Sequence, residues 1–198
     1  MRRVSITAAL ALLLVGAVAA GAQSKDGKAP AAAPSIGQAL DGQLKGAEGE
    51  FVSAAEAMPD ATFDFAPTSG EFKGVRTFAQ QVKHVAATNY LFYSAVAGEK
   101  PPADTGGESG PDALKSKDEI IKYLKDSYAY AHKVLTGTTA GRWMASVPAI
   151  FPGGPTTPLG VAVLQQGHMF DHYGQMVEYL RMNEIIPPAS RPRPPAKK

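Results

Sequence analysis

The sequence predicts an all-α fold, a single-domain four-helix bundle with long connections between the helices. Apolar residues recur at steps of three and four in four long segments, which is the spacing of one helical face. No segment alternates polar and apolar residues convincingly enough to predict a strand, and no internal repeat stands out. With 198 residues, the chain has the length of one ordinary domain with a well-filled core.

The first helix is expected over residues 36–58. One face of it carries Ile36, Leu40, Leu44, Ala47, Phe51, Ala54 and Met58. Several glycines lower its helix propensity, so tertiary packing must hold it. Pro59 and Pro67 then break the pattern, and the alternating Phe63 and Phe65 indicate an ordered loop that lies on the domain.

The second helix is expected over residues 72–97, ending at Gly98 and the prolines that follow it. One stripe of it consists of Phe78, Val82, Val85, Asn89, Phe92 and Val96, with Gln81, His84, Thr88 and Leu91 beside it. After a Gly-rich loop, the third helix begins at a capping box, in which Ser116 and Glu119 each bond the other's backbone N–H. Its seam is Ile121, Leu124, Tyr128, Ala131 and Leu135.

The fourth helix is expected to begin near Thr157 and Pro158, a plausible N-cap followed by proline at the first helical position, and to end before Pro187. A long Gly/Pro/Thr connection around the sole Trp143 precedes it. The stripe expected to face the bundle interior is Val161, Leu164, His168, His172, Gln175, Tyr179 and Met182.

The N-terminus is typical of a secretory signal peptide over residues 1–22. A short basic start precedes an apolar run, and Ala20-Gly21-Ala22 supplies small residues for cleavage after Ala22. The apolar run is short for a membrane anchor, so no stable membrane span is expected after cleavage. The sequence therefore predicts export to the periplasm or the extracellular space. A flexible linker follows over residues 23–35.

Charge separates along the chain. Residues 35–190 carry 12 Lys/Arg and 17 Asp/Glu, whereas the basic Pro-rich tail, residues 191–198, carries four positive charges and no acid. An acidic domain argues against a nucleic-acid surface, so no nucleic-acid partner is expected. The chain has no cysteine, which excludes disulfides and a thiol nucleophile of its own.

His168 and His172 are the first candidate site residues. Side chains four residues apart on a helix project side by side, and two such imidazoles can share one metal ion. The pair could equally be core histidines bonded to carbonyls or hydroxyls. The metalloprotease motif requires Glu after the first histidine, and Met169 stands there instead.

His84 strengthens the metal interpretation, because a histidine from a second helix is the third ligand that a bundle-core site needs. His132 lies one position off the seam of the third helix and is expected at a boundary or on the surface. Asp171 is either a second-shell partner that orients a ligand imidazole or a solvated charge. It is also the only candidate catalytic residue.

These motifs together resemble the DinB/YfiT-like superfamily of metal-binding four-helix bundles. The resemblance covers roughly residues 36–190 and is weak in the middle. The matching residues are Phe65-Ala66-Pro67, Gly70-Glu71, His84, His168, His172 and Gly174-Gln175.

The resemblance implies a bundle with a crossover in which His84, His168 and His172 bind one divalent metal, zinc or nickel, and leave further positions to water. Some relatives are thiol-dependent transferases or isomerases, some resemble metal-dependent hydrolases, and many form homodimers. The predicted signal peptide departs from the family pattern. Since it predicts export, the cytosolic thiol cosubstrates of the transferases are not expected where this chain acts.

Three functions stay open at this point. The chain could be an exported metal-dependent hydrolase acting on a small molecule, a non-catalytic bundle that binds a metal or a small ligand, or a thiol-dependent transferase.

Overall fold

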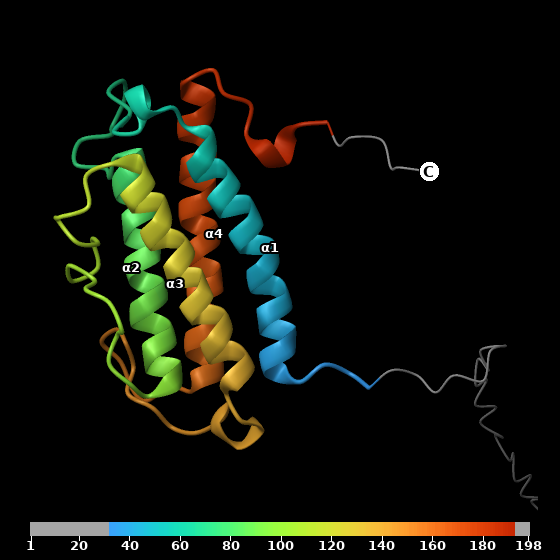
Figure 1. Ribbon diagram of the computed structural model, residues 1–198. Helices are drawn as coiled ribbons and strands as arrows, with labels where there is room; N and C mark the ends of the chain where they lie inside the picture. Colours follow the sequence, from blue (N-terminus) through green and yellow to red (C-terminus); the bar gives the residue numbers. More distant parts are fainter. Residues whose placement is uncertain (1–31, 193–198) are drawn as a thin grey trace, which may run out of the picture. The chain divides into compact units, whose positions relative to one another are not determined.

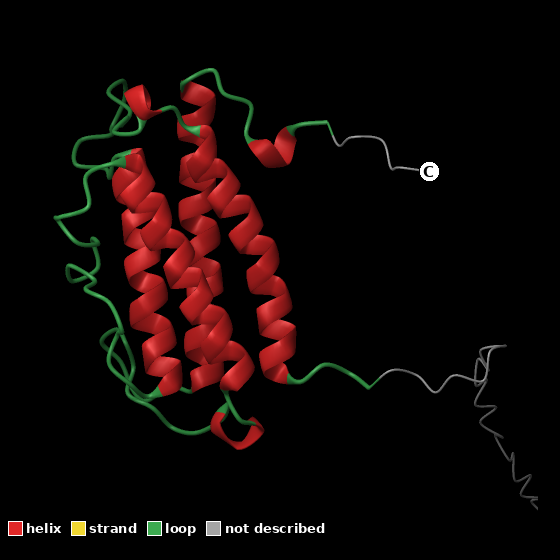
Figure 2. Cartoon of the chain, viewed as in Figure 1, coloured by secondary structure: helices red, strands yellow, loops and turns green. Residues whose placement is uncertain are grey.

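The computed structural model describes residues 32–192. The predicted signal peptide lies outside this range, as do residues 23–31 of the predicted linker and 193–198 of the predicted tail. The described part contains four long α-helices and three short 3₁₀ turns, and no strand is found in it (Figure 2). The prediction of an all-α four-helix bundle is confirmed. None of the helices in residues 32–192 is long and apolar enough to cross a membrane.

The helices are α1 (Ile36–Ala57), α2 (Phe78–Ala97), α3 (Lys117–Gly137) and α4 (Pro158–Met182). Each begins at a hydroxyl side chain that accepts a hydrogen bond from a first-turn N–H, and these N-caps are Ser35, Thr77, Ser116 and Thr157. The predicted caps of α3 and α4 are confirmed. The predicted start of α2 at residue 72 is wrong, because a capping box between Thr77 and Gln80 starts the helix six residues later.

The order of the helices around the bundle explains the long connections. Both α1 and α2 pack against α3 and α4, so α1 and α2 lie diagonally opposite each other. In Figure 1, α1 and α4 run in one direction and α2 and α3 in the other. Since α2 and α3 are parallel neighbours, the connection over residues 98–116 must return along the whole bundle.

The loop between α1 and α2 is ordered on the domain, as predicted. Phe63 is buried and packs edge-to-face on Phe78 with ring centroids 5.5 Å apart, and Phe65 packs on Tyr179 at 5.7 Å. The carbonyls of Phe63 and Phe65 accept hydrogen bonds from the backbone N–H groups of Ala79 and Phe78. The loop therefore satisfies N–H groups in the first turn of α2, which have no partner within the helix.

The inward face of α4 differs in part from the prediction. Leu164 and Met182 were expected inside, but they are 48% and 50% exposed. The buried face instead includes Ala162, Gln165, Met169 and other residues of the same side. The predicted stripe follows the edge of the buried face that borders α2, so some of its residues are exposed to solvent.

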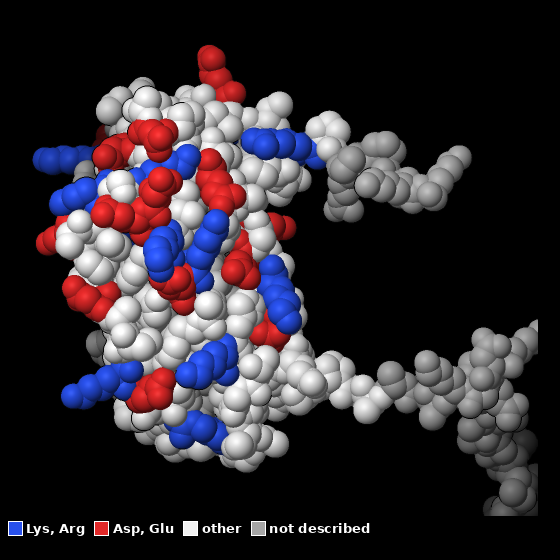
Figure 3. All heavy atoms as spheres, in the orientation of Figure 1, with Lys and Arg blue, Asp and Glu red and all other residues white. Residues whose placement is uncertain are grey.

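His132 ties α1 to α3 at the boundary where the sequence places it. Its Nδ1 lies 2.6 Å from Oδ1 of Asp41, and its Nε2 lies 3.0 Å from Oε2 of Glu48. Burial raises the pKa of Asp41, but hydrogen bonds from Lys45 and His132 outweigh this and leave the pKa below its usual value. Elsewhere on the α1/α3 face, acidic and basic side chains are interspersed (Figure 3).

Gly37 lies where the backbones of α1 and α3 come close together. A Cβ at this position would lie 2.3 Å from the carbonyl oxygen of Leu135, whereas a Cβ at Gly42 on the same helix would meet nothing within 4 Å. Both residues lie in α1, so they differ mainly in the space available.

We expect Gly37→Ala to lower the free energy of unfolding by about 1–3 kcal/mol, because the helices must move apart to accommodate the methyl group. Gly42→Ala is the matched control and should raise stability by about 0.5–1 kcal/mol through helix propensity. Urea unfolding followed by circular dichroism measures both. Equal effects of the two substitutions would contradict the close approach.

Candidate metal centre

The three predicted ligands come together between two adjacent helices. α2 carries His84, and α4 carries His168 and His172 one turn apart. His84 and His172 are buried, at 3% and 6% exposure, whereas His168 is half-buried. In residues 32–192 these three form the one group of histidine, cysteine and acidic side chains with metal-ligand spacing.

The imidazoles converge through their Nε2 atoms. Nε2 of His168 lies 3.1 Å from Nε2 of His84 and 3.0 Å from Nε2 of His172. Two nitrogens that share one tetrahedral zinc ion, each about 2.0–2.1 Å from it, lie about 3.3 Å apart. These two distances are close to that value, and all three ligand atoms lie within 4.8 Å of one another, so the cluster has the spacing to hold one ion.

The loop after α2 determines the tautomer of His84. Nδ1 of His84 lies 2.6 Å from the backbone carbonyl oxygen of Glu108, and a carbonyl can only accept, so this nitrogen carries the proton. The loop is tightly turned and close to α2. Gly106, Gly107 and Gly110 all have positive φ, and a Cβ at Gly110 would lie 2.8 Å from Cβ of Lys83.

A chain of side-chain hydrogen bonds determines the tautomer of His172. Asp171, at the far end, accepts from Nε2 of Gln175 at 3.0 Å. Oε1 of Gln175 then accepts from Nε2 of Gln81 at 2.7 Å, and Oε1 of Gln81 accepts from Nδ1 of His172 at 2.6 Å. Because a carboxylate only accepts, Asp171 orients both amides and leaves the proton of His172 on Nδ1.

One sequence interpretation expected Asp171 to bond a ligand imidazole directly. The structure shows no such bond, because Asp171 accepts from Gln175 instead. Its side chain is exposed, as the other interpretation expected, and it reaches His172 through two glutamines.

His168 is held by packing. Its ring stacks on Phe92, with centroids 5.9 Å apart and planes 13° apart. Its Nδ1 is buried and has no hydrogen-bond partner among the described residues. Unlike the other two imidazoles, it has no acceptor that determines its tautomer.

A count of protons tests whether these residues fit a cation. With their protons on Nδ1, neutral His84 and His172 both present Nε2 lone pairs toward His168. A proton on Nε2 of His168 could satisfy one of these lone pairs but not both. A divalent cation accepts all three lone pairs together, so the donor set fits a metal ion better than a proton.

The electrostatic environment keeps the imidazoles neutral. The pKa of His84 lies below its usual value, that of His168 is lowered to about 4 and that of His172 to about 3, with burial as the main cause. The neighbouring imidazoles and the positive charge of Arg76 contribute the rest of the lowering for His168 and His172. Neutral imidazole is the form that binds a metal ion.

The fold and the cluster define a class of protein, a four-helix bundle with a three-histidine cluster that could hold a metal ion. Residues 43–176 match the family profile described as the DinB superfamily. The chain belongs to this superfamily. A comparison with curated proteins finds no match.

Solved structures show the same fold. A DinB-like protein from Bacillus subtilis matches with a TM-score of 0.60 and 15% identity over 78% of this chain and 99% of that one. A conserved protein from Enterococcus faecalis matches with a TM-score of 0.58 and 18% identity over 76% and 98%. A DinB-like protein from Bacillus cereus matches with a TM-score of 0.58 and 16% identity over 75% and 95%.

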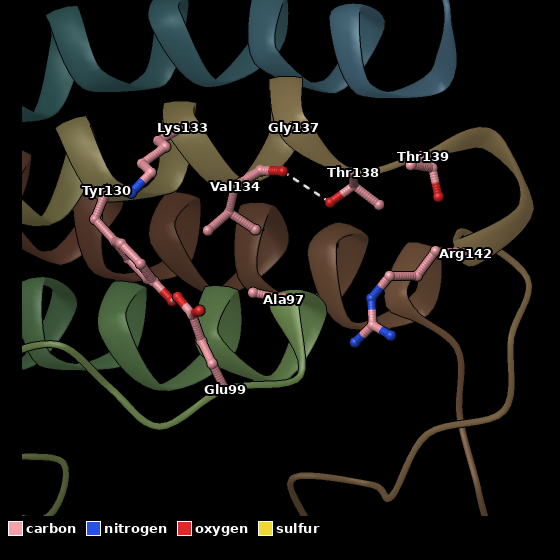
Figure 4. A pocket seen from close by; sticks show the side chains of 9 residues that line it. All are labelled: Ala97, Glu99, Tyr130, Lys133, Val134, Gly137, Thr138, Thr139 and Arg142. Atoms are coloured by element: carbon pink, nitrogen blue, oxygen red, sulfur yellow. Dashed lines mark hydrogen bonds between the residues drawn. The ribbon is translucent and has the colours of Figure 1, made fainter.

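A separate surface pocket lies at the ends of α2 and α3 (Figure 4). Several of its polar groups bond one another or the backbone. Tyr130 donates to Glu99 at 2.9 Å, Nε of Arg142 donates to the carbonyl of Val96 at 2.8 Å, and Thr138 donates to the carbonyl of Val134 at 2.7 Å. These bonds tie the helix ends together, whereas the metal-ligand spacing in residues 32–192 is found at the histidine cluster.

The sequence predicts the three histidines but not the groups that orient them. Gln81 precedes His84 by one turn, and this spacing is a usable signal for a partner on the same face. Glu108 contributes a backbone carbonyl, which every residue has, so no side-chain pattern identifies it. Phe92 was assigned only to the apolar stripe.

Gln81 offers a direct test of the chain of hydrogen bonds. We expect Gln81→Leu to weaken zinc affinity about 10–100-fold, because Nδ1 of His172 loses its acceptor. Gln166→Leu is the matched control, since this buried amide bonds the carbonyl of Leu40 and no histidine. Competition with a chelating dye measures both affinities. Equal affinities for the two variants would contradict the orienting role of Gln81.

Proposed function

We propose that this chain is an exported metal-dependent hydrolase that binds one divalent ion, zinc or nickel, through His84, His168 and His172. The observation that carries the proposal is the convergence of three Nε2 atoms. In His84 and His172, an acceptor bonds Nδ1–H, so the lone pair of Nε2 is directed toward the centre of the cluster. Three imidazoles are a ligand set used in catalytic zinc sites, which keep a further position open.

The position of the cluster supports a catalytic role. His168 is half-buried, whereas His84 and His172 are buried, so one side of the cluster is closer to solvent. A structural zinc site would be closed by a fourth protein ligand. Among the described residues, no other histidine, cysteine or acidic side chain joins the three.

A divalent ion held by three neutral ligands supplies Lewis acidity, which polarises a carbonyl group and acidifies water. The residues of the chain supply orientation. The carbonyl of Glu108 and the amide of Gln81 hold two of the ligands in the required tautomer, and Phe92 holds the third by stacking. Asp171 stays the candidate general base, because it is exposed and directly precedes His172.

The alternative is a non-catalytic bundle in which the ion ties α2 to α4. This alternative rests on the same cluster, since a ligand that binds only the folded state adds stability whether or not it reacts. The two functions differ in their response to chelation. Only the hydrolase loses a reaction rate, while both lose thermal stability.

The metal prediction is tested with untagged mature protein. We expect about one zinc or nickel ion per chain in the wild type and only background metal after His168→Ala with His172→Ala, because two of three ligands are gone. Hydrolysis of activated esters should stop on chelation and return with metal. Elemental analysis and a spectrophotometric ester assay measure the two effects.

His132→Ala is the control, because His132 bonds Asp41 and Glu48 and contributes no ligand to the cluster. This variant should keep its metal. Wild-type protein without metal under replete conditions would contradict the proposed site. Metal without chelator-sensitive hydrolysis would favour the non-catalytic alternative.

Export is a separate part of the proposal and rests on the first 22 residues of the sequence. We expect the chain expressed in a bacterial host to be recovered outside the cytoplasm with Gln23 as its first residue. Cell fractionation followed by N-terminal sequencing measures this. Recovery in the cytoplasm with residues 1–22 intact would contradict export.

A further inference from the structure

An apolar cavity of about 200 Å³ lies between the connection that precedes α4 and the N-terminal part of α4. It is lined by Ala149, Ile150, Phe151, Pro152, Gly153, Thr156, Val161 and Leu164. No charged side chain lines it, and Thr156 carries its only side-chain hydroxyl. The size and lining suit a short alkyl chain or an aromatic ring.

One wall of the cavity is a loop with a closed base. Val147 and Thr156 form an isolated antiparallel bridge with two backbone hydrogen bonds of 2.9 Å. The residues between them contain three prolines and two glycines but no charge. The bridge therefore holds the two ends of this apolar loop together, directly before α4 begins.

The other wall is the part of α4 that leads to the cluster. Val161 and Leu164 precede His168 by seven and four residues, which places all three on one side of the helix. Four residues correspond to a rise of about 6 Å along the axis. The cavity thus lies about one helical turn from a predicted ligand.

Aromatic contacts connect the loop to the same ligand. Phe151 packs edge-to-face on Phe92 with centroids 5.7 Å apart, and the Phe92 ring stacks on His168. Phe92 is buried, whereas Phe151 and Leu164 are 51% and 48% exposed. Two large apolar side chains that line the cavity are therefore left in contact with solvent, and a ligand could cover both.

We infer that this cavity is the subsite for an apolar alkyl or aryl group of a small molecule whose polar head is bound at the His84–His168–His172 cluster. The inference rests on the proposed metal function and specifies its substrate class. The substrate carries its reactive carbonyl next to an uncharged apolar group, because the subsite has no charge to pair with an ionised one.

The test uses two hydroxamates that share one metal-chelating head group. Acetohydroxamate has a methyl tail, and hexanohydroxamate has four more methylene groups. Isothermal titration of both into zinc-loaded wild-type protein should show tighter binding of hexanohydroxamate by about tenfold or more, since each buried methylene contributes about fourfold.

Variants locate the tail. Phe151→Ala and Leu164→Ala should lose most of the gain for hexanohydroxamate and keep the affinity for acetohydroxamate. Phe170→Ala and Val163→Ala are the matched controls, because these apolar residues are similarly exposed on α4 but do not line the cavity. Both controls should keep the gain. All four substitutions replace exposed side chains, so folding should be retained.

Three results would overturn the subsite. Equal affinities of the two hydroxamates for the wild type would show that no apolar group is bound. A gain that survives in both cavity variants would place the tail elsewhere. Equal affinities together with a dimer that dissociates in Phe151→Ala would assign the apolar surface to a second copy of the chain.

Failure of the metal function gives a different result. In that case zinc does not bind, or acetohydroxamate does not bind the zinc-loaded protein, and the subsite falls together with the proposed function. Binding of acetohydroxamate without a gain for hexanohydroxamate overturns the subsite alone.

Discussion

The site depends on one constraint: three imidazole Nε2 atoms converge, and at most one of them can carry a proton to satisfy the lone pairs of the others. His84 and His172 both donate from Nδ1 to oxygen acceptors, so their Nε2 lone pairs face His168. Converging lone pairs repel one another unless a positive charge lies between them. The surrounding hydrogen bonds hold the rings in this arrangement, which is costly without a cation and favourable with one.

The helix order of the bundle supplies one of these hydrogen bonds. Because α2 and α3 are parallel neighbours, the chain between them must travel the length of the bundle, and it passes His84 on the way. The carbonyl of Glu108 belongs to this connection, and Gly110 allows it to lie directly on Lys83. A bundle with a short turn between antiparallel α2 and α3 would have no backbone at this place. The crossover is thus part of the site as well as of the fold.

The sequence predicts the fold well because its signals are local. The capping box of Ser116 and Glu119 marks the start of α3 correctly, and Thr77 with Gln80 forms the same pattern at the true start of α2. The exposed position of Leu164 was missed, because steps of three and four identify a broad face but not its centre. The three histidines could be predicted because the chain contains only four histidines and two of them are spaced one helical turn apart. The acceptor at Glu108 could not be predicted, since it depends on where a loop passes in space.

His168 differs from the other two imidazoles of the cluster in how its ring is held. Its ring is oriented by the face of Phe92, and its Nδ1 has no protein acceptor among the described residues. A stacked ring can slide and rotate in its plane at lower cost than a ring held by a directional hydrogen bond. His168 is therefore the imidazole of the cluster that can change its orientation most easily. The aromatic contact that orients it continues through Phe92 to Phe151 on the apolar loop. Movement of that loop would reach the cluster through His168, while His84 and His172 stay fixed by their acceptors.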